Sequence, residues 1–158
     1  MLINEMTEKE CGAFLTSASL GRLGCALDNQ PYVVPIYFAY EPGYIYVLST
    51  FGRKTEWMRA NPKVCVEVEE ITNESQWTSV IANGRYQELP EPQYTGEREH
   101  ARKLLAKRHQ WGQNALGERQ LRLGGDLITP LFFRICVDSM TGLRAVAESV
   151  ESGKAPQK

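Results

Sequence analysis

The chain has 158 residues, of which 42% are hydrophobic and 23% are charged, and this composition predicts one globular domain rather than a disordered or fibrous chain. The formal net charge of -1 gives no overall attraction to polyanions, and no basic stripe interleaved with aromatic residues points to nucleic acid as a partner. No apolar run reaches the roughly 20 residues that cross a bilayer, and the N-terminus lacks a secretion-signal pattern, so we expect a cytoplasmic protein with no membrane partner.

The start of the chain combines a helix with a β-hairpin. Thr7 and Glu10 have the spacing of a capping box, which predicts a helix that ends near Ser17. Turn-forming residues at 28–31 separate two runs rich in β-branched and aromatic residues, and this pattern predicts two antiparallel strands. Helical spacing returns after Thr50, which is placed to cap a second helix.

The remaining chain continues this mainly β pattern. Strands are predicted over residues 21–27, 32–40, 44–48, 64–71, 78–89 and 127–137, with further helices over 51–60 and 97–109. Asn83-Gly84 interrupts one strand and predicts a bulge or bend in it. Because no β-α-β alternation is present, we expect a mainly β fold with flanking helices, an antiparallel barrel of about six strands. One domain is predicted over residues 1–148, followed by a disordered tail over 149–158.

Two adjacent cations stand where the second helix begins. Arg53 and Lys54 fall in its first turn and face the positive end of the helix dipole, which costs up to about 1 kcal/mol for each poorly screened charge. An anion bound there would remove the cost, and Gly52 would let it approach the backbone closely. A phosphate monoester is the natural candidate. The alternative is a solvated helix start, in which these cations point into water or pair with Glu56.

A resemblance to a known family rests on ordered segments of the chain. LGRLGCAL, YVVPIYF, IYVLSTFGRKTEWMRANPKVCVEV and WTSVIANGRYQEL follow one another between Leu20 and Leu89, and TPLFFRICVDSMTGLRA extends the likeness to Ala145. This string resembles the pyridoxamine 5'-phosphate oxidase-like FMN-binding split barrels, most closely the branch that includes nitroimidazole-resistance proteins. The resemblance implies a split β-barrel, flavin mononucleotide (FMN) as the cofactor, and a homodimer with FMN at the subunit interface.

The same resemblance implies a set of cofactor-binding positions. The basic pair predicted above matches the family's grip on the FMN phosphate, which agrees with the dipole argument. Taken alone, Trp77 is more often an aromatic of the core or of an interface than a flavin contact. The implied positions are Val34, Pro35, Ile36 and Tyr37 beside the isoalloxazine ring, Leu48 and Ser49 at the ribityl chain or phosphate, Arg53 and Lys54 at the phosphate, and Trp77 and Ser79 at the flavin from across the barrel.

The expected function is that of an FMN-dependent oxidoreductase, which passes electrons from a reduced donor through FMN to a small organic acceptor. A nicotinamide nucleotide is the candidate donor. No side chain is identified as a catalytic acid or base, so the protein would supply binding, orientation and electrostatics. The chain lacks the Arg-x-His pattern with which the true oxidase holds its pyridoxal substrate, so oxidation of pyridoxamine phosphate is not expected.

Two alternatives of different classes remain at this point. The first is a non-enzymatic flavin carrier or redox sensor with the same fold and phosphate site. The second is a haem-binding split barrel, because His100 and His109 lie on the predicted basic helix and some split-barrel relatives bind haem. That helix is otherwise either a solvated face or a second anion site.

No metal site is expected. The cysteines lie far apart in the sequence and form no CxxC pair, and the chain has only 2 histidines to help them bind a metal. We therefore expect ordinary buried thiols at Cys11, Cys25, Cys65 and Cys136.

Overall fold

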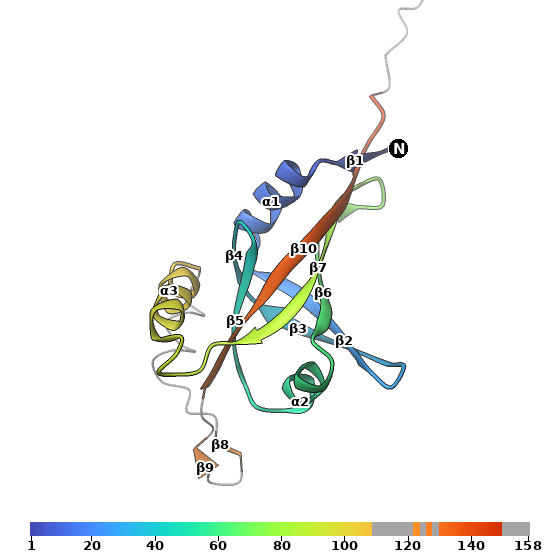
Figure 1. Cartoon of the computed structure of the whole chain (residues 1–158). Coiled ribbons are helices and arrows are strands. Elements are labelled where there is room, and N and C mark those ends of the chain that lie inside the picture. The colour runs from blue at the N-terminus through green and yellow to red at the C-terminus, as the bar shows by residue number, and fades with distance from the viewer. Residues whose placement is uncertain (109–121, 124–125, 128–129, 150–158) are drawn as a thin grey trace, which may run out of the picture.

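The structure is a computed structural model that describes residues 1–108, 122–123, 126–127 and 130–149 (Figure 1). Its helices are α1 (Glu8–Ser17), α2 (Arg53–Ala60) and α3 (Thr95–Ala106). Its strands are β1 (Leu2–Met6), β2 (Leu20–Leu27), β3 (Gln30–Tyr37), β4 (Ala39–Glu41), β5 (Tyr44–Thr50), β6 (Lys63–Asn73), β7 (Gln76–Glu88), β8 (Arg122–Leu123), β9 (Asp126–Leu127) and β10 (Pro130–Val146).

The predicted elements are present with three main differences. Strand β1 was not predicted, and the last strand continues to Val146 instead of ending at Val137. The strand predicted over 32–40 is divided at Phe38 into β3 and β4. His109 and the predicted tail from residue 150 lie outside the described residues.

The sheet is antiparallel and curls toward a barrel without closing. Its strands follow the order β3-β2-β6-β7-β10-β5-β4, and a separate pair is formed by β8 and β9. One edge of β10 pairs with β7, and its other edge pairs with β5 along its first half and with β1 near its end. The two outermost strands, β3 and β4, are joined in the chain by Phe38 alone, so both ends of the sheet meet at one corner. This arrangement confirms the predicted mainly β split barrel with flanking helices.

The hairpin between β2 and β3 turns through two residues. Asp28 and Asn29 both adopt positive φ angles, of 48° and 63°. Leu27 pairs directly with Gln30, so these two residues alone form the loop. Asn and Asp tolerate the left-handed region better than most residues, and paired positive φ angles match the right-handed twist of the strands. The predicted four-residue turn is therefore shorter, and its last two residues belong to β3.

The irregularity predicted at Asn83-Gly84 lies instead on the neighbouring strand. Strand β7 runs without a break, whereas the register of β10 shifts between Val137 and Ser139, directly opposite that dipeptide. Gly84 is required by close backbone approach, because a Cβ atom there would lie 2.3 Å from the carbonyl oxygen of Cys136. The predicted irregularity is therefore a bulge of β10 rather than of β7.

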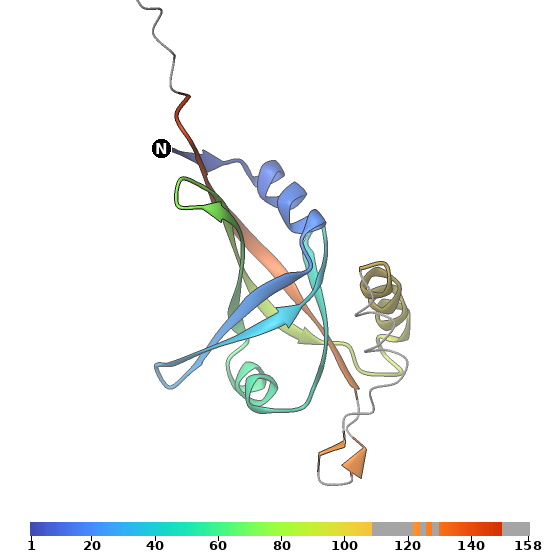
Figure 2. The ribbon, with the colours of Figure 1, turned by 180° about the vertical axis from the view of Figure 1, so that it is seen from behind.

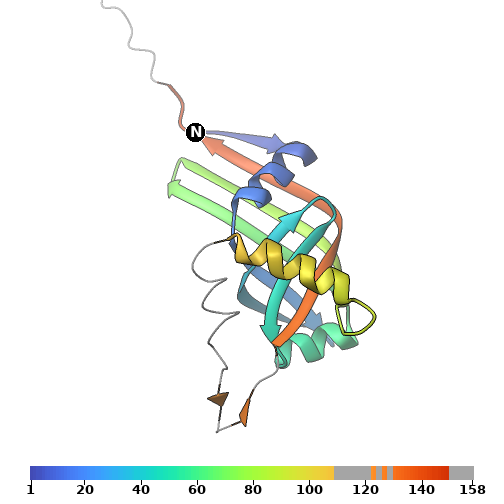
Figure 3. The same cartoon turned by 90° about the vertical axis from the view of Figure 1, so that its left-hand side faces the viewer.

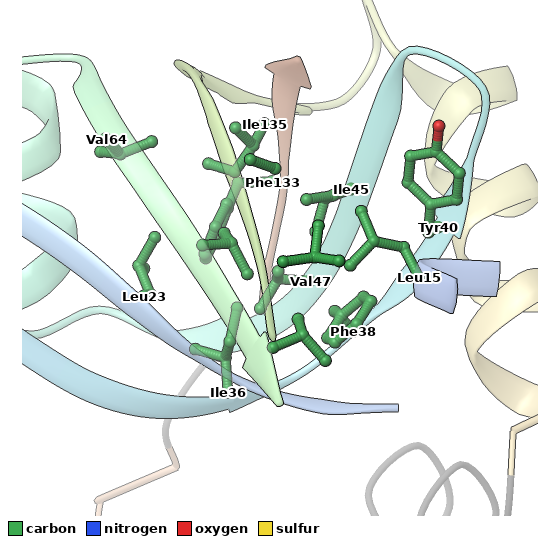
Figure 4. Close-up of a cluster of buried hydrophobic side chains, with 14 of the residues drawn as sticks. Leu15, Leu23, Ile36, Phe38, Tyr40, Ile45, Val47, Val64, Phe133 and Ile135 are labelled. Carbon is green, nitrogen blue, oxygen red and sulfur yellow. The ribbon is translucent and has the colours of Figure 1, made fainter. Parts of the chain in front are cut away.

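The main hydrophobic core fills the inside of the curled sheet. Figure 4 shows side chains from α1 and from several strands meeting there. The labelled members of this core are Leu15, Leu23, Ile36, Phe38, Tyr40, Ile45, Val47, Val64, Phe133 and Ile135. Removal of these apolar side chains from water is the largest favourable contribution to the stability of the sheet.

A second, smaller core lies on the outer side of the sheet, under α3. Phe132 and Phe133 are adjacent in β10 and point to opposite faces, so one joins each core. Ala101 and Leu105 of α3 are buried against Phe132, and Figure 3 shows the helix lying across β4 and β5. Both faces of β5 are therefore covered along part of its length.

Side chains cap helix α1 at both of its ends. The predicted capping box is confirmed: the Thr7 N–H donates to Glu10 Oε2 over 2.7 Å, and the Glu10 N–H donates to Thr7 Oγ1 over 3.2 Å. At the other end, the Arg108 guanidinium donates to the carbonyl oxygens of Thr16 and Ala18. Since α1 has no basic residue in its own last turn, the segment after α3 supplies the cation that its C-terminus favours.

Three further findings concern the cysteines, possible metal ligands and the helices. The four cysteines are free; Cys11 and Cys25 are buried, while Cys65 and Cys136 are half-buried, so the prediction of buried thiols is correct for the first two. Within the described residues, no group of three or more His, Cys, Asp or Glu side chains could hold a metal ion. No helix in the described part of the chain is long and apolar enough to cross a membrane.

Candidate functional site

In the part of the chain that the structure describes, β3 and the end of β5 each have a backbone edge that pairs with no neighbouring strand. Strand β3 pairs with β2 on one side only. Strand β4 covers β5 only at Tyr44–Tyr46, which leaves Val47–Thr50 paired with β10 alone. Within the described residues, no backbone hydrogen bond joins β3 to β5. Unpaired N–H and C=O groups of this kind are available to a ligand. They belong to the strands where the sequence predicts contacts with an isoalloxazine ring and its ribityl chain.

The four predicted residues of β3 do not share one face. Ile36 belongs to the core and Val34 packs against it, whereas Pro35 and Tyr37 lie on the outer face. Tyr37 is 44% exposed. What these residues have in common is the edge of β3 that pairs with no other strand in the described part of the chain, and the predicted contact runs through this backbone.

The end of β5 presents little side-chain chemistry. Leu48 packs toward the outer core under α3, and the Ser49 hydroxyl lies 3.4 Å from the carbonyl oxygen of Thr50. Their predicted contacts with a ribityl chain or phosphate therefore depend on the backbone and on one hydroxyl group.

The start of α2 differs from the prediction in its cap. Thr50 is the last residue of β5 and does not cap the helix, because two residues separate it from the first turn. Gly52 is the N-cap, and its N–H donates to Thr55 Oγ1 over 2.8 Å while the Thr55 hydroxyl donates to its carbonyl oxygen over 2.8 Å. Thr55 is fully buried, so this bond fixes the first turn. A Cβ atom at Gly52 would meet nothing within 4 Å, which leaves open space beside the backbone.

Arg53 and Lys54 lie in the first turn of α2, as predicted. Arg53 is exposed, Lys54 is half-buried, and neither forms an ion pair within the part of the chain that the structure describes. The alternative pairing with Glu56 is therefore not found. Burial lowers the pKa of the Lys54 ammonium below its ordinary value, because no carboxylate offsets the lost hydration. Free helix amides, an open backbone and two uncompensated cations together form a site suited to an anion.

A polar network holds the other end of α2 against the sheet. Arg59 forms a two-pronged pair with Glu88 of β7, with Nη2 3.1 Å from Oε2. The Tyr86 hydroxyl donates to Glu88 Oε1 over 2.7 Å. Burial and this hydrogen bond raise the pKa of Tyr86, while the Arg59 contact lowers the pKa of Glu88. Asn61 also donates to the carbonyl oxygen of Ala26 over 2.9 Å, and Figure 2 shows the helix held at one end of the curled sheet. The sequence alone did not point to this network.

Trp77 and Ser79 lie apart from the basic pair. Both are on the outer face of β7, and β6 and β2 separate that strand from β3. The Ser79 hydroxyl donates to Glu67 Oε1 over 3.1 Å, and Glu67 lies 3.4 Å from Arg22. Within one protomer, the structure therefore does not bring these two residues to the start of α2. The same outer face carries exposed apolar side chains, namely Leu20, Val33, Ile71, Ile81 and Leu143.

The histidine of the basic helix already has structural partners. His100 Nε2 lies 2.8 Å from Glu41 Oε2, and the ring meets Tyr46 edge-on with centroids 5.7 Å apart. The Tyr46 hydroxyl donates to Glu41 Oε1 over 2.7 Å. Burial and this bond raise the pKa of Tyr46 to about 12. These contacts join α3 to the β4–β5 hairpin, and they engage the imidazole nitrogen that a haem iron would need.

Comparisons with known proteins agree with this fold. The family model described as pyridoxamine 5'-phosphate oxidase matches residues 7–144. An uncharacterized protein of Rhizobium meliloti (strain 1021) is 39% identical over 149 residues, which cover 93% of this chain and 98% of that protein. The crystal structure of a FAD-binding protein from Mesorhizobium loti has 39% identity and a TM-score of 0.76, with coverage of 92% of this chain and 100% of that one.

More distant structures share the fold alone. The FAD binding protein from Mycobacterium smegmatis has 20% identity and a TM-score of 0.60, with coverage of 88% of this chain and 97% of that one. A protein from Bacteroides thetaiotaomicron, ascribed to 5-nitroimidazole antibiotic resistance, has 20% identity and a TM-score of 0.63, with coverage of 91% and 89%. At such identities the likeness supports the split-barrel architecture and no particular ligand.

Proposed function

Because the chain belongs to the pyridoxamine 5'-phosphate oxidase family, we propose that it is a flavin-binding protein whose cofactor is FMN and whose activity is that of an oxidoreductase. The relative from Mesorhizobium loti is named as a FAD-binding protein, and FMN and FAD share the isoalloxazine ring, the ribityl chain and a phosphate at its end. The start of α2 carries the proposal. There, an exposed Arg53 and a half-buried Lys54 stand without carboxylate partners among the described residues.

The residues present fit a phosphate monoester in particular. Such a group carries close to two negative charges and accepts several hydrogen bonds at once. The guanidinium of Arg53, the ammonium of Lys54 and the first amides of α2 would supply these bonds, and the open space at Gly52 admits the group. FMN ends in a monoester, whereas FAD continues into a pyrophosphate and an adenosine that this short helix start would have to accommodate as well.

The strand edges would orient the rest of the cofactor. An isoalloxazine ring carries one N–H and several acceptor atoms along an edge, and the edge of β3 that pairs with no strand among the described residues offers donors and acceptors to them. The backbone of Val47–Thr50 lies between that region and the helix start, where a ribityl chain would run. When bound, FMN supplies the transfer of hydride or single electrons, and the protein supplies binding and orientation. A nicotinamide nucleotide is the proposed donor, with a small organic molecule as the acceptor.

We further propose that the working form is a cytoplasmic homodimer with the flavin at the interface. Ser79 and Trp77 are too far along the sheet to join the basic pair within one protomer. The outer face around them exposes Ile71 at 64% and Val33 at 62%, an unusual amount of apolar surface for strands that face water. A second copy packed on this face would cover it and could bring Ser79 to the partner's flavin.

The test of the site compares FMN with riboflavin, which lacks the phosphate. We expect Arg53→Ala combined with Lys54→Ala to weaken FMN binding by at least ~2 kcal/mol, or roughly 30-fold, because two charge-assisted contacts are lost together. Riboflavin binding should change little. Lys103→Ala combined with Lys107→Ala removes two exposed cations from the α3 region and serves as the matched control. Fluorescence titration of each flavin measures the affinities, and an unchanged FMN affinity in the first variant would refute the phosphate site.

Two further measurements separate the finer parts of the proposal. Titration with FAD in parallel tests the cofactor, since tighter binding of FAD than of FMN would overturn the choice of FMN. Addition of NADH or NADPH to the FMN-loaded protein should bleach the flavin absorbance at about 450 nm, and an added acceptor should restore it. A flavin that stays oxidised with every donor would instead favour the non-enzymatic carrier.

A further inference from the structure

The ring of Tyr32 lies beside Arg53, at the predicted phosphate site. The guanidinium carbon of Arg53 is 5.7 Å from the centroid of the Tyr32 ring, which is within the range of a cation–π contact. On α2, the Trp57 ring packs against the same tyrosine, with centroids 5.6 Å apart and planes inclined by 54°. Tyr32 belongs to β3, is half-buried, and packs against the main core together with Trp57. A residue of the sheet therefore orients the exposed cation of the helix.

Arg53 combines a ring contact with the lack of an ion pair, which separates it from five other arginines of the described residues. Several arginines among the described residues lie within ion-pair distance of a carboxylate, namely Arg22, Arg59, Arg85, Arg98 and Arg102. A carboxylate fixes a guanidinium but also neutralises it and occupies its N–H donors. An aromatic ring restrains the guanidinium through its face while leaving the positive charge and the N–H edges free. This is the arrangement that a site for an anion requires.

We propose that Tyr32 is a positioning residue, which holds Arg53 in place for the phosphate of FMN before the cofactor arrives. This inference rests on the proposed function. A free arginine side chain loses rotamer entropy when it is fixed on a ligand, and a restraint present beforehand removes part of that loss. Tyr32 is not expected to touch the phosphate; it acts through Arg53, and Trp57 supports its ring from the helix.

The experiment uses two substitutions at one position. Tyr32→Leu removes the ring, whereas Tyr32→Phe keeps the ring and removes only the hydroxyl. We expect Tyr32→Leu to weaken FMN binding about 3- to 10-fold with riboflavin binding unchanged, in line with the strength of a partly exposed cation–π contact. Tyr32→Phe should bind both flavins as the unmodified protein does. Weaker FMN binding in Tyr32→Phe, equal to that in Tyr32→Leu, would overturn the inference because the ring would then be irrelevant.

A matched control removes a comparable contact elsewhere. The Arg134 guanidinium lies 4.4 Å from the centroid of the Tyr44 ring, under α3 and away from the start of α2. Tyr44→Leu should leave the ratio of FMN to riboflavin affinity unchanged. A change in that ratio equal to the one in Tyr32→Leu would show that general loosening of the sheet explains both results, and it would overturn the inference.

A double-mutant cycle separates this inference from the proposed function. In an Arg53→Ala background, Tyr32→Leu should cause no further loss of FMN affinity, because its only route to the phosphate is gone. An equal loss with and without Arg53 would overturn the positioning role. If the unmodified protein binds FMN no better than riboflavin, the proposed phosphate site itself fails. If that preference is present and Tyr32→Leu keeps it, the phosphate site stands and only this inference fails.

Discussion

Replacing Lys54 with methionine should change stability and cofactor binding in opposite directions. Lys54 is half-buried at the positive end of α2, and no carboxylate among the described residues compensates its charge. Met has a similar length and shape and carries no charge, so Lys54→Met retains the packing and removes the desolvated ammonium. A side chain that serves only to pack would not show opposite changes in stability and in FMN binding.

The expected gain in stability follows from the partial burial of Lys54. Full burial of an ammonium costs several kcal/mol, and Lys54 keeps part of its hydration, so we expect the FMN-free Lys54→Met protein to be about 1 kcal/mol more stable. The same substitution removes one charge-assisted contact with the phosphate, worth about 1.5–3 kcal/mol, which corresponds to roughly 10- to 150-fold weaker binding of FMN. Lys63→Met, at an exposed position on β6, should alter neither quantity by more than about 0.5 kcal/mol.

The pH dependence gives a further check with a defined sign. Burial lowers the pKa of Lys54 in the folded protein, so between that pKa and the ordinary value of 10.5 the unfolded chain binds more protons. Lys54 therefore contributes a gain in stability as pH rises through this window, and Lys54→Met lacks this contribution. The advantage of the variant should be full near pH 7 and should fade as pH approaches about 10.5. Urea unfolding at several pH values measures it, and a variant that is less stable than the parent at pH 7 would refute the reasoning.

The remaining predictions concern the sheet. Gly84→Ala should destabilise the protein by about 1–3 kcal/mol or more in urea unfolding, because the new Cβ would lie 2.3 Å from the backbone oxygen of Cys136, whereas Gly96→Ala, with nothing within 4 Å, should cost nothing. Equal stability of the two variants would contradict the close approach. Tyr46 should ionise near pH 12 in an ultraviolet titration, as burial and its bond to Glu41 require, and a tyrosine signal near pH 10 that disappears in Tyr46→Phe would contradict this. Because its pKa is raised on folding, Tyr46 should contribute to a loss of stability between about pH 10 and 12.

The parts of the fold that the sequence predicted carry strong local signals. The capping box at Thr7 is complete within four residues, and the hairpin turn is determined by two residues that accept positive φ angles. Strand β1 has no such signal, since it is held by its pairing with the far end of β10. The bulge was expected in β7 because Gly84 marks a close approach of two strands. Either strand of such a pair can carry the extra residue, and here β10 does.

The candidate site likewise contains residues that the sequence could identify and residues that it could not. Arg53 and Lys54 could be found in the sequence because a cation at a helix start conflicts with the local dipole. The cap could not be found so easily, since Thr50 and Gly52 are both acceptable cap residues and the choice depends on the buried Thr55. Nothing in the sequence indicated that Tyr32 contacts Arg53, because this contact exists only once β3 and α2 pack together.

The long strand β10 has a consequence for how the chain assembles during synthesis. Within the described sheet, β10 alone joins the β3-β2-β6-β7 half to the β5-β4 half, and it also holds β1. Its residues leave the ribosome after those of every other strand in that sheet, so until then the edges of β7 and β5 that β10 will pair have no partner. Pairing of Leu2 with Val146 then closes a loop that spans nearly the whole described chain. Such distant pairing is slow, so this last step sets how long the nascent chain exposes strands that could pair with a neighbour.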